Sequence, residues 1–388
     1  MSKRFIPVAA PVLAGNEKAY VLDCIESEWI SSCGKYVEKF ERAFADFCGV
    51  RYAISCNSGT AALHVALLAL GIGAGDEVIV PTLTFVATAN AVTYCGARPR
   101  FVDIEPDTWT IDPALIEAKI TSRTKAIIPV HLYGYVANME AITAIARRYS
   151  LFVVEDAAEA HGAEFRERRV GSLSDVGAFS FYGNKIISSG EGGMVVTDSE
   201  KVAQYAAQLR GQGMDLHRRY WFPRIGYNYR MPNLTAAVGL AQLERVDWYL
   251  NRRREVASWY RDLLRDVPGI AWQTAKEGRG HVDWLFTILL GEPIQVSRDD
   301  VMSKLLERGV ETRPVFYPMH VLPPYQEMGK EDGGFPVAER VARAGISLPT
   351  WAGLGYEDVV FVCEALRECI DEVKYFADLR PELCGRLV

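Results

Sequence analysis

Residues 151–162 read LFVVEDAAEAHG, and residues 179–194 read FSFYGNKIISSGEGGM. The first stretch is a short apolar run that ends in an acid, Asp156, and a lysine, Lys185, follows the apolar start of the second. A short continuous apolar run bounded by polar residues is typical of a buried strand. In α/β proteins, residues at the carboxyl ends of such strands face the crevice that binds ligands. The two stretches therefore predict an α/β fold with a ligand site at one edge of its sheet.

Strand-like runs alternate with helix-length segments through the first two-thirds of the chain. The runs are continuous rather than alternating, which suits strands covered by helices on both faces. This order predicts a mostly parallel sheet with right-handed crossovers. The expected strands cover 52–55, 77–81, 100–103, 126–130, 151–155, 178–181 and 193–197, and expected helices between them include 60–71 and 111–121.

The pattern changes near residue 235, where helical periodicity replaces the alternation. The expected elements are one long helix or two joined helices over 234–265, a strand over 283–290, a helix over 299–308 capped by Ser297, and a final amphipathic helix over 356–376. We therefore predict a large domain over 1–245 and a smaller α+β domain over 246–388.

The composition is that of an ordinary globular protein. The 388 residues are 49% hydrophobic and 24% charged, with a formal net charge of -6. Nothing in this balance favours nucleic acid or an anionic membrane as a partner. No apolar run suggests a signal peptide or a membrane span. Eight cysteines occur without a Cys-x-x-Cys pair, so we predict reduced thiols, no metal site and a cytoplasmic location.

The pairing of Lys185 with Asp156 is the arrangement that pyridoxal 5'-phosphate (PLP) chemistry needs. A loop lysine is usually a solvated charge, but aromatic and glycine residues flank Lys185. The amine of Lys185 would form a Schiff base with the cofactor aldehyde, and Asp156 would pair with the protonated pyridine nitrogen. The lysine needs a lowered pKa, through desolvation or a nearby cation. Once released, the same amine would move a proton between substrate and cofactor.

The remaining cofactor contacts are expected at three places. Ser58, Gly59 and Thr60 follow a strand and open a helix, which makes either a phosphate cradle or an ordinary helix N-cap. Phe85 lies just past a strand, where an aromatic ring would stack on the pyridine or would simply belong to the core. Glu159 is near enough to reach the phenolic side of the ring. His161 is expected to be structural, because a lone histidine is a weak signal.

Two further segments carry clustered donors. The segment Tyr227-Asn228-Tyr229-Arg230 is rich in phosphate donors, and its alternative is a turn into the next helix with Asn233 as N-cap. Residues 313–320 place Arg313, Tyr317 and His320 in a proline-rich loop. Such a loop would bind a polar, phosphate-bearing ligand, or it is a stiff connection between domains.

Taken together, these motifs resemble the DegT/DnrJ/EryC1/StrS family of PLP-dependent nucleotide-sugar aminotransferases. The resemblance begins at Trp29-Ile30-Ser31-Ser32 and runs across essentially the whole chain. It implies the aspartate-aminotransferase-like fold, fold type I, and a homodimer with shared active sites. By position, Lys185 and Asp156 match the catalytic pair, and the phosphate ligands match Ser58, Gly59, Thr60 and Ser180. Phe85 matches the stacking ring, and Asn228 matches an asparagine that reaches the partner subunit's cofactor.

Within the family, residues 180–185 and 311–320 are most similar to members that aminate the C4 ketone of GDP-4-keto-6-deoxy-D-mannose, giving GDP-perosamine. Glu159 stands where many relatives have glutamine, and glutamate also occurs in this group. The implied reaction is ping-pong: L-glutamate converts PLP to pyridoxamine phosphate (PMP), and the 4-keto-6-deoxy sugar then takes the amine.

Other activities stay open on the sequence alone. Relatives also act on dTDP- or UDP-linked 4-keto or 3-keto sugars. A PLP-dependent sugar 3-dehydratase would typically carry histidine in place of Lys185, and a cofactor-binding protein without catalysis would not need both Lys185 and Asp156. Both residues are present, which favours the aminotransferase.

Overall fold

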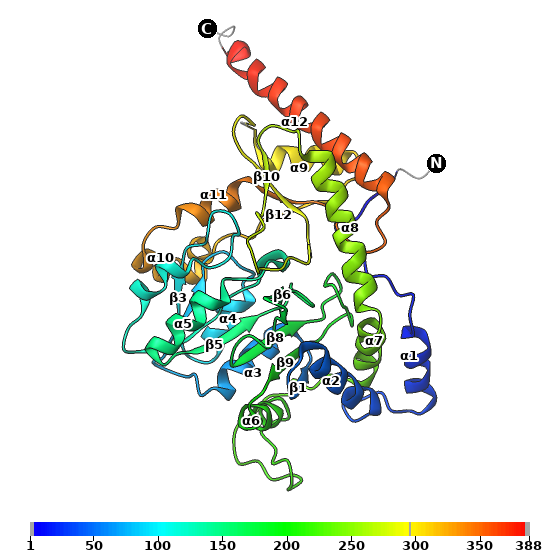
Figure 1. The fold of residues 1–388 in the computed structure, drawn as a ribbon, viewed down its shortest axis with the longest axis vertical. Coiled ribbons are helices and arrows are strands. Elements are labelled where there is room, and N and C mark those ends of the chain that lie inside the picture. The colour runs from blue at the N-terminus through cyan, green and yellow to red at the C-terminus, as the bar shows by residue number, and fades with distance from the viewer. Residues whose placement is uncertain (1–3, 295, 385–388) are drawn as a thin grey trace.

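The structure, a computed structural model, describes residues 4–294 and 296–384 (Figure 1). Within these ranges the central feature is a seven-stranded sheet. Its strands, in spatial order, are β1 (Tyr52–Cys56), β9 (Gly193–Thr197), β8 (Val176–Ser180), β5 (Phe152–Asp156), β4 (Thr124–Ile127), β2 (Glu77–Pro81) and β3 (Arg98–Val102). All neighbours pair in parallel except β9, which runs antiparallel to both β1 and β8.

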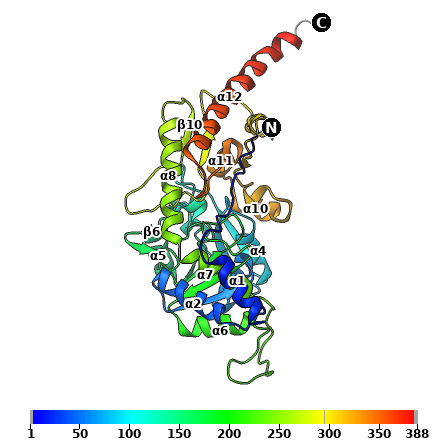
Figure 2. The ribbon, with the colours of Figure 1, turned by 90° about the vertical axis from the view of Figure 1, so that its right-hand side faces the viewer.

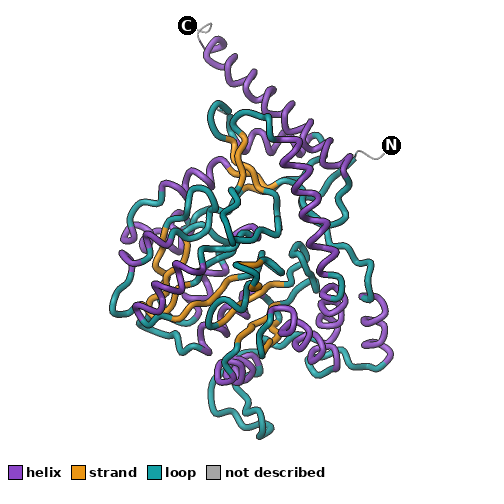
Figure 3. The backbone as a smooth tube through the Cα atoms, viewed as in Figure 1, coloured by secondary structure: helices purple, strands orange, loops and turns teal. Residues whose placement is uncertain are grey.

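The mostly parallel sheet that the sequence predicts is therefore confirmed. Each of the seven predicted runs overlaps one of these strands, and β2 and β9 have the predicted bounds. Strands β2 and β9 are buried along their whole length, as expected for strands covered on both faces. Figure 3 shows the strands in the interior with helices around them.

The helices that cover this sheet have the predicted apolar character. Helix α3 (Gly59–Ala69) is buried from Ala61 to Leu67 and packs against β8 and β9. Helix α5 (Met139–Tyr149) packs against β4 and β5. The others in this part of the chain are α1 (Glu17–Glu26), α2 (Lys35–Cys48), α4 (Ala87–Tyr94), α6 (Glu200–Arg210) and α7 (Asn233–Leu243).

Two local expectations need correction. The predicted helix over 111–121 is two short 3₁₀ turns, Pro113–Leu115 and Glu117–Lys119; only Ile111 and Ile116 of this segment are buried, too few to hold an α-helix against the core. The predicted strand over 283–290 is shorter, β11 (Thr287–Leu290), because its pairing with the neighbouring strand 345–347 begins only at Thr287; Asp283, at the predicted start, has a left-handed backbone with φ of 49°. Of the two alternatives predicted for 234–265, the structure has two helices, α7 and α8 (Val246–Leu264).

The C-terminal third builds a second layer around a four-stranded sheet. In spatial order this sheet contains β10 (Ile270–Trp272), β11, β13 (Gly345–Ser347) and β12 (Arg313–Pro314). It shares a hydrophobic cluster with α8, α9 (Arg298–Glu307) and α12 (Tyr356–Cys384). Helix α9 is capped by Ser297 as predicted, since the Ser297 hydroxyl accepts a bond from the Asp300 amide.

Some contacts cross residue 245, the predicted domain boundary. Ile6 belongs to the second cluster and bridges to Val310. In the other direction, Val315, Met319 and Tyr325 belong to the cluster of the large sheet. So do parts of α11 (Pro336–Ala344), and α10 (Gln326–Asp332) packs against β3. The division into two domains stays a prediction.

Two segments project from the body in both views (Figures 1 and 2). Helix α12 extends away from one end of the molecule, and the loop after α6 extends from the other. This loop exposes Tyr220, Trp221, Phe222 and Ile225. In the ranges that the structure describes, no helix combines the length and apolarity needed to cross a membrane.

Candidate active site

The carboxyl ends of several parallel strands meet at one edge of the large sheet and open into a cavity of about 400 Å³. Asp156 is the last residue of β5, Ser180 is the last of β8, and Ser58 follows β1 by two positions. Because parallel strands end at a common edge, residues far apart in the sequence converge there. The cavity is lined by nine of the predicted site residues: Ser58, Gly59, Thr60, Phe85, Asp156, Glu159, Ser180, Lys185 and Arg313.

Asp156 points into this cavity, whereas its neighbour Glu155 does not line it. One carboxylate oxygen of Asp156, Oδ2, accepts a 2.7 Å bond from the Thr88 hydroxyl, and Oδ1 accepts a 3.3 Å bond from the Ala158 amide. Burial raises the pKa of Asp156, and the Thr88 bond and the Lys185 charge oppose this rise. The buried carboxylate is therefore held ready to accept a cation inside the cavity.

Glu155 has a structural role and stabilises the loop that precedes β8. Its carboxylate is fully buried and accepts bonds from the amides of Gly171 and Leu173, the Ser174 hydroxyl and the His131 ring. Successive side chains of a strand point to opposite faces, so only one of these two adjacent acids can serve the cavity.

Lys185 lies beside Glu159 at the centre of the cavity. The Lys185 Nζ atom is 3.6 Å from Oε1 of Glu159 and 3.9 Å from the centre of the Trp284 ring. Burial lowers the pKa of Lys185, and the nearby carboxylates of Glu159 and Asp156 oppose this shift. Burial raises the pKa of Glu159 to about 7. Both effects favour a neutral amine, which is the form that attacks a carbonyl carbon.

The opposite end of the cavity is built for an anion. The first amides of a helix have no intrahelical partner and point out along the helix axis, and Gly59 and Thr60 supply such amides at the start of α3. The Ser58 hydroxyl accepts a 3.1 Å bond from the Ala61 amide. Ser58 is thus an N-cap, and its hydroxyl proton remains available to an anion, so the two sequence interpretations are compatible.

Gly59 is required at this position by close packing. A Cβ atom on Gly59 would lie 2.6 Å from the Ser180 Cβ, inside any ordinary contact distance. The strand β9 approaches equally closely, because a Cβ on Gly193 would lie 2.2 Å from the Ser58 carbonyl oxygen. The backbone at 58–59 is therefore pressed against the sheet, which leaves its outer side to a ligand.

Aromatic residues that the sequence analysis missed form one wall of the cavity. Trp284 and Phe316 line it, and the Tyr133 ring is stacked between them, with interplanar angles of 14° and 13°. Phe85 extends this row, 5.7 Å from Phe316, and is 54% exposed. The Trp284 indole donates a 2.8 Å bond to the Asn184 carbonyl, which fixes the residue before Lys185. The only sequence signal for this wall was the aromatic content near 284 and 316.

Three predicted residues do not line this cavity. Asn228 is exposed, and Tyr317 is 59% exposed. His320 is held elsewhere, by a 2.7 Å bond to Thr82 and a 3.3 Å contact with Glu339. Within one chain, the structure therefore does not bring these three side chains to Lys185.

His161 is a core residue, as the sequence analysis expects. Its ring is packed among Phe44, Phe179 and Phe181. Burial lowers the pKa of His161 to about 3, and the charges of Lys185 and Arg253 act in the same direction. Burial therefore disfavours the charged form of this ring.

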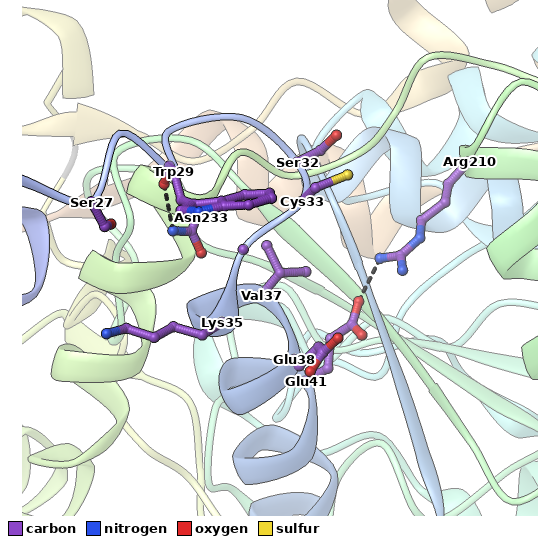
Figure 4. A pocket seen from close by; sticks show the side chains of 11 residues that line it. Ser27, Trp29, Ser32, Cys33, Lys35, Val37, Glu38, Glu41, Arg210 and Asn233 are labelled. Atoms are coloured by element: carbon purple, nitrogen blue, oxygen red, sulfur yellow. Dashed lines mark hydrogen bonds and ion pairs between the residues drawn. The ribbon is translucent and has the colours of Figure 1, made fainter. Parts of the chain in front are cut away.

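A second cavity, of about 740 Å³, lies between the segment 27–38 and the start of α7 (Figure 4). Two pairs of its polar groups bond each other: Arg210 donates to Glu41 at 2.5 Å, and the Asn233 amide donates to the Trp29 carbonyl at 2.6 Å. Asn233 also accepts a bond from the Tyr36 amide. It therefore holds the start of α2 and, contrary to the N-cap interpretation, does not cap its own helix.

The donor set of the first cavity fits PLP. A buried carboxylate at Asp156 suits a protonated ring nitrogen, the α3 N-terminus suits a phosphate, and the Lys185 amine lies among them. The close approach at Gly59 keeps the anion-binding backbone bare. These features together satisfy the charge and bonding needs of that cofactor.

Comparisons with known proteins agree with this geometry. The sequence profile of the DegT/DnrJ/EryC1/StrS aminotransferase family matches residues 11–367. The chain is 53% identical to a GDP-perosamine synthase of Caulobacter vibrioides and 46% identical to one of Escherichia coli O157:H7, each over 94% of this chain and 98% of the relative.

A similar solved structure is a putative sugar aminotransferase, Spr1654 of Streptococcus pneumoniae, in its PMP form. It is 26% identical, with a TM-score of 0.90, over 97% of this chain and all of that one. The fold type that the resemblance implies is thus confirmed. The chain belongs to the DegT/DnrJ/EryC1/StrS family of PLP-dependent nucleotide-sugar aminotransferases.

Proposed function

We propose that this enzyme transfers an amino group from L-glutamate to the C4 ketone of GDP-4-keto-6-deoxy-D-mannose and so forms GDP-perosamine. The observation that carries this proposal is the 53% identity, over 94% of the chain, to a relative named GDP-perosamine synthase. The segments 180–185 and 311–320, which suggested the same sugar from the sequence, support it.

The residues of the cavity divide the chemistry among them. When bound, PLP supplies an electron sink for the carbon whose C–H bond is broken. Asp156 would keep the ring nitrogen protonated, because a buried carboxylate favours an adjacent cation. Lys185 would accept a proton at its Nζ atom and later return it, because burial favours the neutral amine and a neutral amine can accept a proton. The Gly59 and Thr60 amides would hold the phosphate, with the Ser58 and Ser180 hydroxyls beside them.

The substrate would enter along the aromatic wall. Trp284 and Phe316 give the cavity an apolar face, and Arg313 adds a cation. A guanidinium is suited to a carboxylate or a phosphate oxygen. We assign Arg313 to substrate binding, and either the glutamate carboxylate or the sugar diphosphate fits its charge.

A homodimer would complete this site. Asn228 is exposed on its own chain, as a residue that reaches a partner's cofactor must be. The loop after α6 carries Tyr220, Trp221 and Ile225 on its surface, and a second copy would cover them. In such a dimer, Tyr317 and His320 would contact substrate from a position outside the cavity of their own chain.

We place the reaction in a reducing compartment such as the cytoplasm. Cys24, Cys33, Cys48, Cys56, Cys95, Cys363 and Cys369 are free thiols. Burial raises the pKa of several of them, for example Cys56 to about 12, so these thiols stay protonated and are slow to oxidise.

A paired turnover assay tests the proposal. Purified enzyme with PLP and L-glutamate is offered GDP-4-keto-6-deoxy-D-mannose or, separately, dTDP-4-keto-6-deoxy-D-glucose, and products are identified by mass spectrometry. We expect an amino sugar and 2-oxoglutarate from the GDP substrate alone, and neither from Lys185→Ala. Product from the dTDP substrate alone would refute the sugar assignment. A deoxygenated sugar formed without 2-oxoglutarate would instead indicate a dehydratase.

A further inference from the structure

Two threonines form a hydrogen-bonded chain with Asp156: Thr88 lies in α4, and Thr84 precedes that helix and also lines the cavity. Thr84 and Thr88 are buried, with 1% and 0% exposure. The Thr88 hydroxyl lies 2.7 Å from Oδ2 of Asp156, and the Thr84 hydroxyl lies 3.1 Å from that of Thr88. The three side chains thus form one continuous chain of hydrogen bonds that ends on the carboxylate.

The direction of this chain follows from the chemistry of its last member. An ionised carboxylate has no proton to give, so Thr88 must donate to Asp156. The hydroxyl of Thr88 has one proton only, and Thr84 must therefore donate to the Thr88 oxygen. Hydrogen bonds aligned in this way polarise and strengthen one another.

We propose that Thr88, supported by Thr84, is the positioning residue that keeps Asp156 ionised and turns one of its oxygens toward the cofactor ring nitrogen. The Thr88 bond occupies Oδ2, while Oδ1 has only a long 3.3 Å bond from the Ala158 amide. Without the Thr88 proton, the buried carboxylate would lose its strongest donor and would hold a proton of its own at higher pH.

The other charged groups near Asp156 come from different elements. Lys185 and His131 each favour its ionised form, and Glu159 stands on the turn that follows β5. None of these groups is bonded to Thr88, so a change at Thr88 leaves them in place. The effect of a Thr88 variant can therefore be assigned to the hydroxyl itself.

A purely structural role would look different, and α4 provides the comparison. Thr93, on the same helix, donates its hydroxyl proton to the Ala89 carbonyl at 3.1 Å, a common way for a helical threonine to satisfy itself. Thr88 instead donates its hydroxyl proton to Asp156, 68 positions away along the chain. Thr93→Val therefore controls for the loss of a threonine hydroxyl from α4 at an exposed position that does not contact Asp156.

The test is the PLP affinity of the full-length protein, measured by fluorescence titration after removal of the cofactor, across mildly acidic to mildly alkaline pH. Valine keeps the shape of threonine but has no donor. We expect Thr88→Val to weaken PLP binding about tenfold to a hundredfold. The acidic limb of the binding curve should also move upward by about one pH unit, because Asp156 protonates more easily.

Controls separate the hydroxyl from packing. Thr88→Ser keeps the donor and should restore affinity and pH dependence to near those of the unsubstituted enzyme, whereas Thr93→Val should change neither. Thr84→Val should move the acidic limb in the same direction by a smaller amount, and it remains informative if Thr88→Val does not fold. In turnover, kcat should fall in Thr88→Val with little change in the sugar KM.

The proposal is wrong if Thr88→Val binds PLP with unchanged affinity and pH dependence, or if Thr88→Ser is as impaired as Thr88→Val. It rests on the aminotransferase chemistry proposed above but not on the identity of the sugar. PLP titration needs no sugar substrate, so a failed perosamine assay and a failed Thr88 test can be told apart.

Discussion

Gly59 leaves no room for a side chain, and Gly59→Ala should therefore damage the phosphate cradle. The new Cβ would lie 2.6 Å from the Ser180 Cβ, which is 0.8 Å inside the 3.4 Å at which ordinary contact begins. The Ser180 Cα, at 3.2 Å, is also too close. Rotation of the Ser180 side chain cannot relieve either contact, because both atoms are fixed by the backbone of β8. The backbone at Gly59 must retreat from the sheet.

The size of the effect follows from this displacement. A forced shift of nearly an ångström lengthens amide-to-phosphate bonds beyond the useful range. Loss of one bond to a charged group costs about 1.5–3 kcal/mol, so PLP should bind about tenfold to a hundredfold more weakly. The overpacking itself should lower the free energy of unfolding by about 1–3 kcal/mol.

The assay pairs fluorescence titration of PLP with thermal unfolding of the cofactor-free protein. Gly73→Ala is the matched control: a Cβ there meets no atom within 4 Å, and the amide of residue 73 keeps its bond to Asp76. Gly59→Ala with Ser180→Gly should recover part of the stability, since the closest contact is then removed. A Gly59→Ala protein that binds PLP as tightly as the Gly73→Ala control would refute the reasoning.

Substitutions at four further residues test other parts of the fold and the site. Glu155→Gln should lower the free energy of unfolding by about 3 kcal/mol, because an amide would face donors that now bond a carboxylate. Asp156→Asn should instead abolish turnover with little loss of stability. Equal melting curves for the two variants would contradict this difference in their roles. Because the pKa of Glu159 is raised in the folded protein, to about 7, its contribution to stability is fully present at acidic pH and is lost as the pH rises toward 7. Glu159→Gln should remove this loss, up to about 3 kcal/mol, and chemical denaturation of the cofactor-free protein across this pH range measures it; an unchanged pH dependence would exclude Glu159 as its source. Trp284→Ala should increase the mobility of Lys185, whose Nζ lies over the indole ring, and should therefore slow PLP binding by the cofactor-free protein. Trp284→Phe should retain most of the binding rate because it keeps an aromatic face. Equal binding rates for both variants would show that the aromatic ring does not hold the lysine.

The sheet could be predicted from the sequence because its strands carry their own signal. Strands that are buried on both faces are continuous apolar runs, so 77–81 and 193–197 are visible without any knowledge of their neighbours. The segment 111–121 was misjudged because its apolar residues sit at a helical spacing, although the structure buries only Ile111 and Ile116 of them. Burial is a property of the surroundings, and local periodicity does not report it.

The site could be predicted where its residues lie at strand ends and helix starts. Asp156, Ser180 and Gly59 occupy such positions, and the structure brings them to one cavity. Trp284 and Phe316 escaped prediction because they come from the C-terminal third, and only its packing against the large sheet brings them to Lys185. Thr88 escaped for a similar reason, since its partner is 68 positions away.

By itself, the sequence determined the layered α/β architecture, the pairing of an acid with a lysine, and the family. Each of these depends on residue type and order along the chain. Only the tertiary structure determined which of the two adjacent acids faces the cavity and which faces the core. Glu155 and Asp156 are adjacent and chemically alike, but strand alternation turns one to the core and the other to the cavity. Only the packing around β5, with donors at Gly171 on one side and Thr88 on the other, assigns those two faces.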